Sequence, residues 1–298
     1  MSNNFIRRTC CPVCGGRKRR AIYLKSFSDD DIWDYLNEFY ESKISKDIIK
    51  DDFYSIVKCK NCSLLYQEYI LSDKNMYLLY ENWISAESSL QKKMVSDIKL
   101  FEQYVLELRR IYLFLKKMPH EINVLEYGMG WGFWSRLAKA LNFKVTGVEL
   151  SESRVEFARR NGVKVIDDIK KELDCVYDYV YSNQVFEHLT EPKKELIELA
   201  RVLKPGGIID IKVPNCQNFE KKFGKINWRL GSKPVHPLEH INCFSRQSLK
   251  ILANQAKLSL VRRPYSFACF GINSCIKGHI EYINDAFFST NVYMRKNK

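Results

Sequence analysis

Residues 124–132 carry the sequence VLEYGMGWG, and this stretch decides the fold class. A short apolar run leads into it, and a helical pattern over residues 131–141 follows. An apolar run that ends in glycines and opens a helix is typical of a strand–turn–helix unit, because glycine lets the backbone turn tightly and approach a ligand. The glycines are spaced G-x-G-x-G after an acidic residue. The G-x-G-x-x-G spacing of dinucleotide sites is different, which disfavours a nicotinamide-dependent oxidoreductase.

Strand and helix patterns alternate from this stretch onward, after one helical pattern that precedes it. Strands are expected at residues 122–126, 144–149, 163–166, 177–182 and 208–213. Helices are expected at residues 97–117, 131–141, 151–161, 191–203 and 246–256. Two further β-like segments, 258–270 and 287–294, suit an antiparallel edge pair. Such alternation predicts an α/β fold, a Rossmann-like doubly wound sheet with helices on both faces.

An acidic residue, Glu149, ends the strand that follows the glycines. It lies about 20 residues beyond Gly128, where a carboxylate can accept hydrogen bonds from both hydroxyls of a ribose. Ligands of such sheets bind at the carboxyl ends of the strands, where the strand order reverses. The glycines and Glu149 together therefore predict a nucleoside site.

The chain resembles the class I S-adenosylmethionine-dependent methyltransferases over roughly residues 95–298. The segments VLEYGMGWGFWSRLAKA and VTGVELSESRVEFARRNG look like the first two motifs of that family. YDYVYSNQVFEHLTEPKKELIELARVLKPGGIIDIKVPN is similar to its fourth strand, the following helix and its fifth strand, and EHINCFSRQSLKILANQAKL resembles the lead into the last two strands. The resemblance implies a mostly parallel, seven-stranded sheet with an antiparallel last strand.

The resemblance also implies which residues contact the methyl donor. The methionine part would be lined or completed by Gly128, Gly130, Gly132, Asn183 and Gln184, with Glu126 near its amino group. The ribose would be bound by Glu149, and the adenine would be met by Leu150 and by Asp167 or Asp168. The alternative for the two aspartates is that they only cap a loop.

Two Cys-x-x-Cys pairs near the N-terminus predict a structural zinc site. Cys11 and Cys14 form one pair, and Cys59 and Cys62 form the other. This spacing brings two thiolates onto one tetrahedral ion, and four thiolates leave no position open for a catalytic water. Cys10 is a less favoured ligand. The segment also resembles the zinc-binding segment of some sugar and natural-product methyltransferases.

The domain organisation follows from these motifs. Residues 1–90 are expected to form a zinc-binding, aromatic-rich module, with a helix of its own near residues 30–40, and residues 91–298 the methyltransferase domain. No apolar run approaches the roughly 20 residues of a membrane span, and the N-terminus lacks a secretory signal. The chain is therefore expected to be cytoplasmic. Its oligomeric state stays open.

Three histidines are candidates for the base that removes a proton from a methyl acceptor. His240 is favoured, then His236, which lies four residues earlier in PVHPLEHINCF, and His188 follows the fourth strand in FEHLTEP. The alternative is that each is an ordinary loop or cap histidine. The tetrapeptide used by many base-amino methyltransferases is absent, which favours transfer to oxygen or carbon.

The net charge of +13 suits an anionic partner. Four thiolates and one zinc ion would leave about +11. The favoured function is a methyltransferase acting on a sugar or nucleotide-linked sugar in polysaccharide or natural-product biosynthesis. An RNA methyltransferase is the alternative, because zinc modules precede some of these and the run Arg17-Lys18-Arg19-Arg20 suits phosphates. A non-catalytic binding protein that retains the fold is the third reading.

Overall fold

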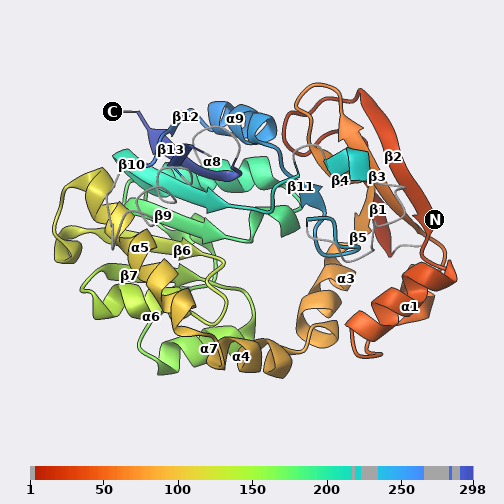
Figure 1. Ribbon diagram of the computed structural model, residues 1–298, viewed down its shortest axis with the longest axis horizontal. Coiled ribbons are helices and arrows are strands. Elements are labelled where there is room, and N and C mark those ends of the chain that lie inside the picture. The colour runs from red at the N-terminus through yellow and green to blue at the C-terminus, as the bar shows by residue number, and fades with distance from the viewer. Residues whose placement is uncertain (1–3, 217–218, 223–233, 265–281, 284–288, 298) are drawn as a thin grey trace. The chain divides into compact units, whose positions relative to one another are not determined.

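The computed structural model divides into two compact units (Figure 1). It describes residues 4–216, 219–222, 234–264, 282–283 and 289–297. The first unit, here called the cysteine unit, comprises Met1–Met94, Phe186–Pro192 and Pro214–Ile251. The second, here called the sheet unit, comprises Val95–Val185, Lys193–Val213 and Leu252–Lys298. The cysteine unit thus combines the N-terminal module with two segments from much later in the sequence.

The sheet unit is built on a seven-stranded sheet with the order β12-β13-β10-β9-β6-β7-β8. Its strands are β6 (Asn123–Tyr127), β7 (Lys144–Val148), β8 (Lys164–Ile166), β9 (Tyr177–Asn183), β10 (Leu203–Lys212), β12 (Leu258–Val261) and β13 (Asn291–Lys296). The strands from β6 to β10 pair in parallel, and β13 pairs antiparallel with both β10 and β12. The predicted Rossmann-like sheet with an antiparallel last strand is confirmed. The strand order reverses between β6 and β9, which is where ligands of such folds bind.

The tail of the sheet is shorter than the sequence pattern indicated. Strand β12 covers only the start of the expected segment 258–270, of which residues 265–270 lie outside the described residues. Strand β13 lies slightly later than the expected segment 287–294. The predicted antiparallel pairing of the two segments is confirmed.

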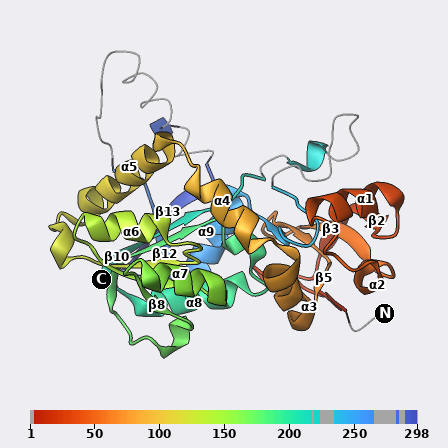
Figure 2. The same cartoon turned by 90° about the horizontal axis from the view of Figure 1, so that it is seen from below.

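Helices cover both faces of the sheet (Figure 2). They are α5 (Ile98–Leu115), α6 (Phe133–Ala140), α7 (Glu152–Arg160) and α8 (Pro192–Val202), and the chain also forms α9 (Arg246–Gln255). Short 3-10 helices occur at η2 (Pro119–Glu121), η3 (Ile169–Lys171), η4 (Phe186–His188) and η5 (Phe219–Lys222). Helix α5 packs Leu108 and Ile111 against the sheet residues Tyr179 and Ile208, in the same buried cluster as Trp134 of α6. The apolar residues whose helical spacing predicted these helices are therefore the ones that pack against the sheet.

The cysteine unit contains a four-stranded antiparallel sheet with the order β11-β4-β3-β2 and a separate β1–β5 pair. The strands are β1 (Phe5–Arg7), β2 (Arg19–Ser26), β3 (Phe53–Cys59), β4 (Leu65–Gln67), β5 (Tyr69–Leu71) and β11 (Asn242–Cys243). The helices are α1 (Asp30–Phe39), α2 (Lys46–Ile49), α3 (Asp73–Leu78), the π-helical turn η1 (Leu79–Trp83) and α4 (Ala86–Met94). The helix expected near residues 30–40 is present as α1.

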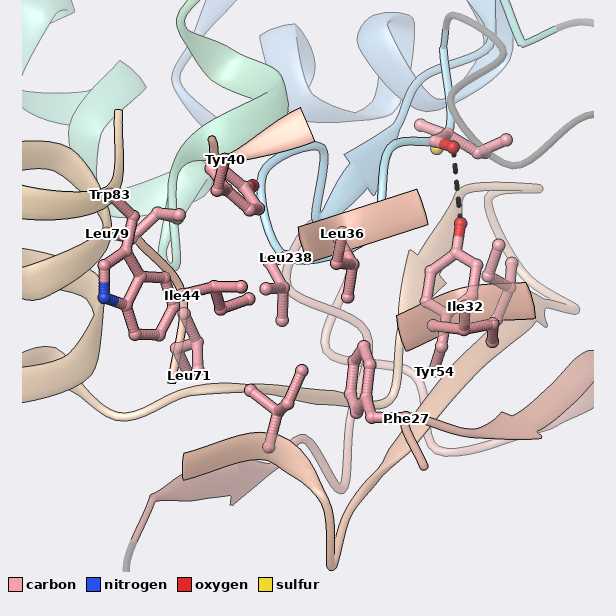
Figure 3. Packing of buried hydrophobic residues seen from close by; sticks show 14 of the residues in the cluster. Phe27, Ile32, Leu36, Tyr40, Ile44, Tyr54, Leu71, Leu79, Trp83 and Leu238 are labelled. Atoms are coloured by element: carbon pink, nitrogen blue, oxygen red, sulfur yellow. Dashed lines mark hydrogen bonds between the residues drawn. The ribbon is translucent and has the colours of Figure 1, made fainter. Parts of the chain in front are cut away.

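Aromatic and aliphatic side chains fill the core of the cysteine unit (Figure 3). Phe27, Tyr40 and Tyr54 are almost fully buried, together with Trp83. The Tyr54 hydroxyl donates a hydrogen bond to the carbonyl oxygen of Val235 at 3.4 Å, and this is the dashed line in Figure 3. Residues from the segment 234–243 therefore belong to the same core as the N-terminal module.

The helices in the described parts of the chain are not suited to cross a membrane. None of them combines the necessary length with sufficient apolar character.

Candidate functional site

The turn after β6, residues 128–132 and here called the glycine turn, has its three glycines in the left-handed region. Gly128 has φ 72°, Gly130 φ 56° and Gly132 φ 69°. Residues with a side chain rarely adopt this conformation, so the sequence places glycine at each position. The N–H groups of Gly128 and Met129 both donate to the carbonyl oxygen of Val148 at 3.0 Å. The turn is thereby tied to the end of β7, and Gly132 starts helix α6.

Two of these glycines are needed for different reasons. A Cβ atom on Gly128 would lie 2.4 Å from Cγ2 of Val185, so packing excludes a side chain there. A Cβ atom on Gly130 would meet no atom of the described chain within 4 Å. Gly130 therefore borders open space at the carboxyl end of β6, which suits the close approach of a ligand to the backbone.

Glu149 faces the glycine turn. Its Oε2 accepts a hydrogen bond from the backbone N–H of Gly130 at 2.8 Å, and its Oε1 accepts from the N–H groups of Leu150 and Ser151 at 3.0 Å each. A carboxylate offers about four lone-pair directions, so the three bonds leave about one, on Oε2, for a ligand hydroxyl. Next to it the Leu150 side chain is 81% exposed and is free to pack against a ring. Both positions fit the roles that the sequence implies.

Glu126 and the residues after β9 flank the same strand ends. Glu126 is buried, and its Oε2 accepts a hydrogen bond from the Ser135 hydroxyl at 2.5 Å. Asn183 is the half-buried last residue of β9. Gln184 is exposed, has φ 57°, and donates its backbone N–H to the carbonyl oxygen of Lys212 at 2.9 Å. These residues and the glycine turn therefore lie at the carboxyl ends of β6 and β9.

The two aspartates after β8 have structural contacts of their own. Asp168 caps η3, since its Oδ1 accepts from the backbone N–H of Lys170 at 2.9 Å. The carboxylate of Asp167 is 69% exposed and pairs with Lys171 at 2.9 Å. Loop capping accounts for Asp168, and a contact of either residue with adenine stays a prediction.

The four cysteines of the two pairs converge in the cysteine unit. The sulfur atoms of Cys11 and Cys62 are 3.5 Å apart, as are those of Cys14 and Cys59, and all four lie within 4.8 Å of one another. Sulfur atoms about 2.3 Å from a tetrahedral ion would be separated by roughly 3.8 Å. The donor set and its spacing therefore fit zinc. Cys10 is exposed and lies outside this group.

Two tight turns hold these cysteines. The N–H of Gly15 donates to the carbonyl oxygen of Cys11 at 2.9 Å, and that of Ser63 donates to Cys59 at 3.1 Å. Gly15 and Ser63 both have positive φ, at 72° and 61°. Each Cys-x-x-Cys pair is thus folded back on itself, which points both sulfur atoms of a pair toward the same place.

The three candidate histidines all lie in the cysteine unit. The rings of His188 and His240 have their centroids 4.9 Å apart. Nδ1 of His188 lies 3.0 Å from the carbonyl oxygen of Glu239, and Nδ1 of His240 lies 3.2 Å from that of Pro234. Because a carbonyl oxygen only accepts, each Nδ1 carries the proton, and Nε2 is the basic nitrogen of the neutral ring.

His236 has a different environment. It is buried among aromatic rings, 4.3 Å from the ring centroid of Phe39 and 5.6 Å from that of Tyr35. Burial lowers the pKa of His236 to about 4, although a hydrogen bond to the Pro237 carbonyl opposes the shift. At neutral pH its ring is therefore uncharged and a weak base.

One residue beside this pair was missed by the sequence reasoning. Glu187 is fully buried, and neither of its carboxylate oxygens has a hydrogen-bond partner among the described residues. Burial raises the pKa of Glu187 to about 8. One of its oxygens lies within 4.8 Å of a ring nitrogen of both His188 and His240. The available signal was an acidic residue directly between Phe186 and the candidate base His188 in FEHL.

Comparison with known proteins identifies one family and several relatives. A family described as a methyltransferase domain matches residues 99–262, more than half of the 298 residues. An uncharacterized protein of Methanocaldococcus jannaschii is 38% identical over 102 residues, which cover 33% of this chain and 48% of the relative. A ubiquinone biosynthesis O-methyltransferase of Bordetella avium is 31% identical over 150 residues, which cover 46% of this chain and 61% of the relative.

The chain therefore spans about half to three fifths of the length of these two relatives. Among solved structures, an S-adenosylmethionine-dependent methyltransferase of Aquifex aeolicus is 22% identical with a TM-score of 0.42. That match covers 60% of this chain and 91% of the other. The likeness concerns the fold.

Proposed function

The chain belongs to the methyltransferase-domain family, and from that premise we propose that it transfers a methyl group from S-adenosylmethionine to a small-molecule acceptor. The observation that carries this proposal is the glycine turn, whose left-handed glycines border open space at Gly130 beside the Glu149 carboxylate. S-adenosylmethionine supplies a sulfonium methyl group for an in-line displacement, in which alignment of the reactants provides much of the acceleration.

The residues of the sheet unit bind and orient the methyl donor in this proposal. Glu149 accepts hydrogen bonds from the ribose hydroxyls, and Leu150 packs against the adenine. Glu126 lies near the amino group of the methionine part. The glycine turn, with Asn183 and Gln184 after β9, forms the rest of that pocket, and Asp167 or Asp168 meets the adenine amine.

His240 is proposed to take the proton of the acceptor, with His188 next to it. The Nδ1–H groups of both rings are bound to backbone carbonyls, so each ring keeps a basic Nε2. His236 ranks behind them because burial lowers its pKa to about 4, which makes it a weak base at neutral pH. A base in this role contributes roughly 10²–10⁴-fold to the rate.

Residues 1–90 are proposed to be a module that zinc stabilises, and residues 91–298 the methyltransferase domain. The four-thiolate set of Cys11, Cys14, Cys59 and Cys62 supports the first part. A closed set of four thiolates offers no coordination position to a substrate, so the zinc ion would act on folding and not on chemistry.

The proposed acceptor is a sugar or nucleotide-linked sugar of polysaccharide or natural-product biosynthesis, methylated on oxygen or carbon. The net charge of +13 favours an anionic acceptor, and the name of the Bordetella avium relative favours oxygen. RNA is less favoured, because two members of the basic run are already paired within the cysteine unit. Arg19 pairs with Glu68 and Arg20 pairs with Glu220, each at 2.8 Å.

Calorimetry and turnover with labelled S-adenosylmethionine test the proposal. The protein should bind S-adenosylmethionine and methylate members of a panel of nucleotide-linked sugars. His240→Gln should keep that binding and lose roughly 10²–10⁴-fold in turnover. Absence of S-adenosylmethionine binding would favour the non-catalytic binding protein, and RNA binding that weakens steeply with salt would favour the RNA methyltransferase.

A further inference from the structure

Three potential metal ligands from two distant segments meet in the cysteine unit. Glu187 and His188 lie on η4, and His240 lies just before β11. A carboxylate oxygen of Glu187 and one ring nitrogen of each histidine all lie within 4.8 Å of one another. These three residues are here called the histidine cluster.

The state of Glu187 indicates a missing positive partner. Its side chain is 0% exposed, and among the described residues neither carboxylate oxygen has a hydrogen-bond partner. Buried charges in proteins are paired, or they coordinate metal ions, because an isolated buried carboxylate is strongly unfavourable. The buried carboxylate of Glu187 therefore indicates that a cation binds next to it.

Both histidines make the backbone contact that metal-ligating histidines usually make. Nδ1 of His188 donates to the carbonyl oxygen of Glu239 at 3.0 Å, and Nδ1 of His240 donates to that of Pro234 at 3.2 Å. A ligating histidine almost always donates its other ring N–H to a carbonyl or carboxylate, which fixes the tautomer and leaves the second nitrogen for the metal. Two histidines in one cluster follow this rule.

One buried network holds the two ligand-bearing segments in place. Nδ2 of Asn242 on β11 donates to the carbonyl oxygens of Phe186 and Leu189 at 3.1 and 2.6 Å, on either side of Glu187 and His188. The guanidinium of Arg8 donates to Oδ1 of Asn242 at 2.8 Å and to the carbonyl oxygen of Ile241 at 2.5 Å. The geometry of the cluster is therefore fixed before any ligand binds, as a metal site requires.

We propose that Glu187, His188 and His240 bind a divalent transition-metal ion, at a site separate from the four cysteines. Two imidazoles and one carboxylate suit Zn²⁺, Mn²⁺ or Fe²⁺, and three protein ligands leave positions open for oxygen atoms of another molecule. The metal site itself does not depend on the proposed function, and one consequence of it rests on that function. Bound to the ion, a hydroxyl of the acceptor would have a lowered pKa and would release its proton to solvent, so that His240 would serve as a ligand and not as the base.

Cobalt substitution tests the site in the full-length protein. After treatment with a chelator, the chain is reconstituted with Co²⁺ and its metal content and absorption spectrum are measured. Cobalt at the cysteines gives a thiolate charge-transfer band, whereas cobalt at the histidine cluster gives only weak bands of nitrogen and oxygen ligation. The wild type should bind one equivalent of each kind.

Variants separate the two sites. Glu187→Gln keeps the size of the side chain and removes its charge, so the protein should fold, and circular dichroism checks this. It should weaken cobalt binding at the histidine cluster by at least about 100-fold, since loss of even an indirect partner of a ligand weakens binding 10–100-fold. His240→Gln should do the same. His120→Gln removes an exposed histidine from η2 and should change nothing.

Two results would overturn the metal site: a wild type that binds only thiolate-ligated cobalt, or Glu187→Gln with unchanged affinity for the second equivalent. Turnover distinguishes this failure from failure of the proposed function. If the protein without metal at the histidine cluster still methylates, and His240→Gln does not, then His240 is the base and no ion takes part in the reaction. A protein that binds the second cobalt but no S-adenosylmethionine keeps the metal site and contradicts the methyltransferase.

Discussion

The glycine turn of the sheet unit and the histidine cluster of the cysteine unit are built in opposite ways. The turn consists of five consecutive residues, 128–132, and presents mainly backbone to its ligand. The cluster consists of side chains from η4 and from the segment before β11, and a network through Arg8 and Asn242 holds it together. The first depends on local chain geometry, and the second depends on the folding of a whole unit.

This difference predicts where substitutions act. At the glycine turn, a side chain alters the space for a ligand while most of the fold contacts stay intact. In the cysteine unit these features are linked. Arg8 lies three residues before the zinc ligand Cys11, and it donates a hydrogen bond to Asn242, which belongs to the antiparallel sheet and holds the histidine cluster. Changes there should affect stability and chemistry together.

Cys59→Ser should give the largest effect. Cys59 ends β3, which pairs with both β2 and β4, so loss of zinc would loosen the centre of the sheet. The cysteine unit should lose roughly 5 kcal/mol or more, since structural zinc supplies about 10–16 kcal/mol in zinc-finger peptides. Metal analysis and hydrogen exchange by mass spectrometry measure this. The affinity for S-adenosylmethionine should change little.

Cys10→Ser is the matched control, because Cys10 is exposed and adjoins the first pair. It should keep both zinc and stability. Full zinc content in Cys59→Ser would remove Cys59 from the ligand set, and zinc loss in Cys10→Ser would add Cys10 to it.

Gly130→Val should have the next largest effect, on the cofactor alone. A β-branched residue at φ 56° strains the backbone by about 1–2 kcal/mol, and its side chain would enter the space left for the ligand. Gly206→Val carries a similar strain at φ 79°, where a Cβ also meets no described atom within 4 Å. Calorimetry should show S-adenosylmethionine affinity at least about 100-fold weaker in Gly130→Val and unchanged in Gly206→Val. Equal affinities in both variants would contradict the pocket.

The same contrast explains what the sequence could predict. The glycine turn, Glu149 and the two cysteine pairs were visible because their chemistry lies in spacing along a short stretch of chain. The strand and helix alternation predicted a parallel sheet with helices on both faces, and the family resemblance implied its antiparallel last strand. Helix α1 was also predicted, from the length of chain between the cysteine pairs.

The parts that escaped prediction are those that depend on pairing between distant segments. Strand β11 has only two residues, and its pairing of Asn242 with Tyr66 leaves no periodic pattern in the sequence. The inclusion of residues 186–192 in the cysteine unit has no local signal either. The burial of Glu187 depends on both of these features. It was not predicted, because a charged residue in a short loop is ordinarily expected at the surface.

Acid should change the contributions of two buried residues to stability, His236 and Asp210, in opposite directions and by about 3 kcal/mol each. Burial lowers the pKa of His236 in the cysteine unit to about 4, from an ordinary 6.5. At this residue the unfolded state therefore binds more protons between these values, so the contribution of His236 to the stability of the cysteine unit falls as pH drops from 6.5 to 4. Glu187 in the same unit acts in the opposite direction, because burial raises its pKa to about 8. Burial raises the pKa of Asp210 in the sheet unit to about 6, despite the opposing charge of Lys212. There the folded state binds more protons, and stability increases as pH falls from 6 to 4.

Hydrogen exchange across this pH range, read separately for the two units, checks both signs. Relative to the wild type, His236→Phe should remove a loss of stability on acidification from the cysteine unit, and Asp210→Asn should remove a gain from the sheet unit. Both units weakening in parallel, with neither variant changing the slope, would show that other groups govern the response to acid.

The smallest effect is expected at the two aspartates after β8. Their variants test whether these residues only cap a loop or also contact adenine. Asp168→Ala should destabilise the sheet unit by about 1 kcal/mol, because its side chain caps the N–H of Lys170. If Asp168 also contacts adenine, the variant should bind S-adenosylmethionine about tenfold more weakly, the loss expected for one hydrogen bond to a neutral group. Asp167→Asn removes only an exposed pair with Lys171 and should leave stability unchanged. Weaker binding in Asp167→Asn alone would assign the adenine contact to Asp167, and unchanged binding in both would make these residues loop caps.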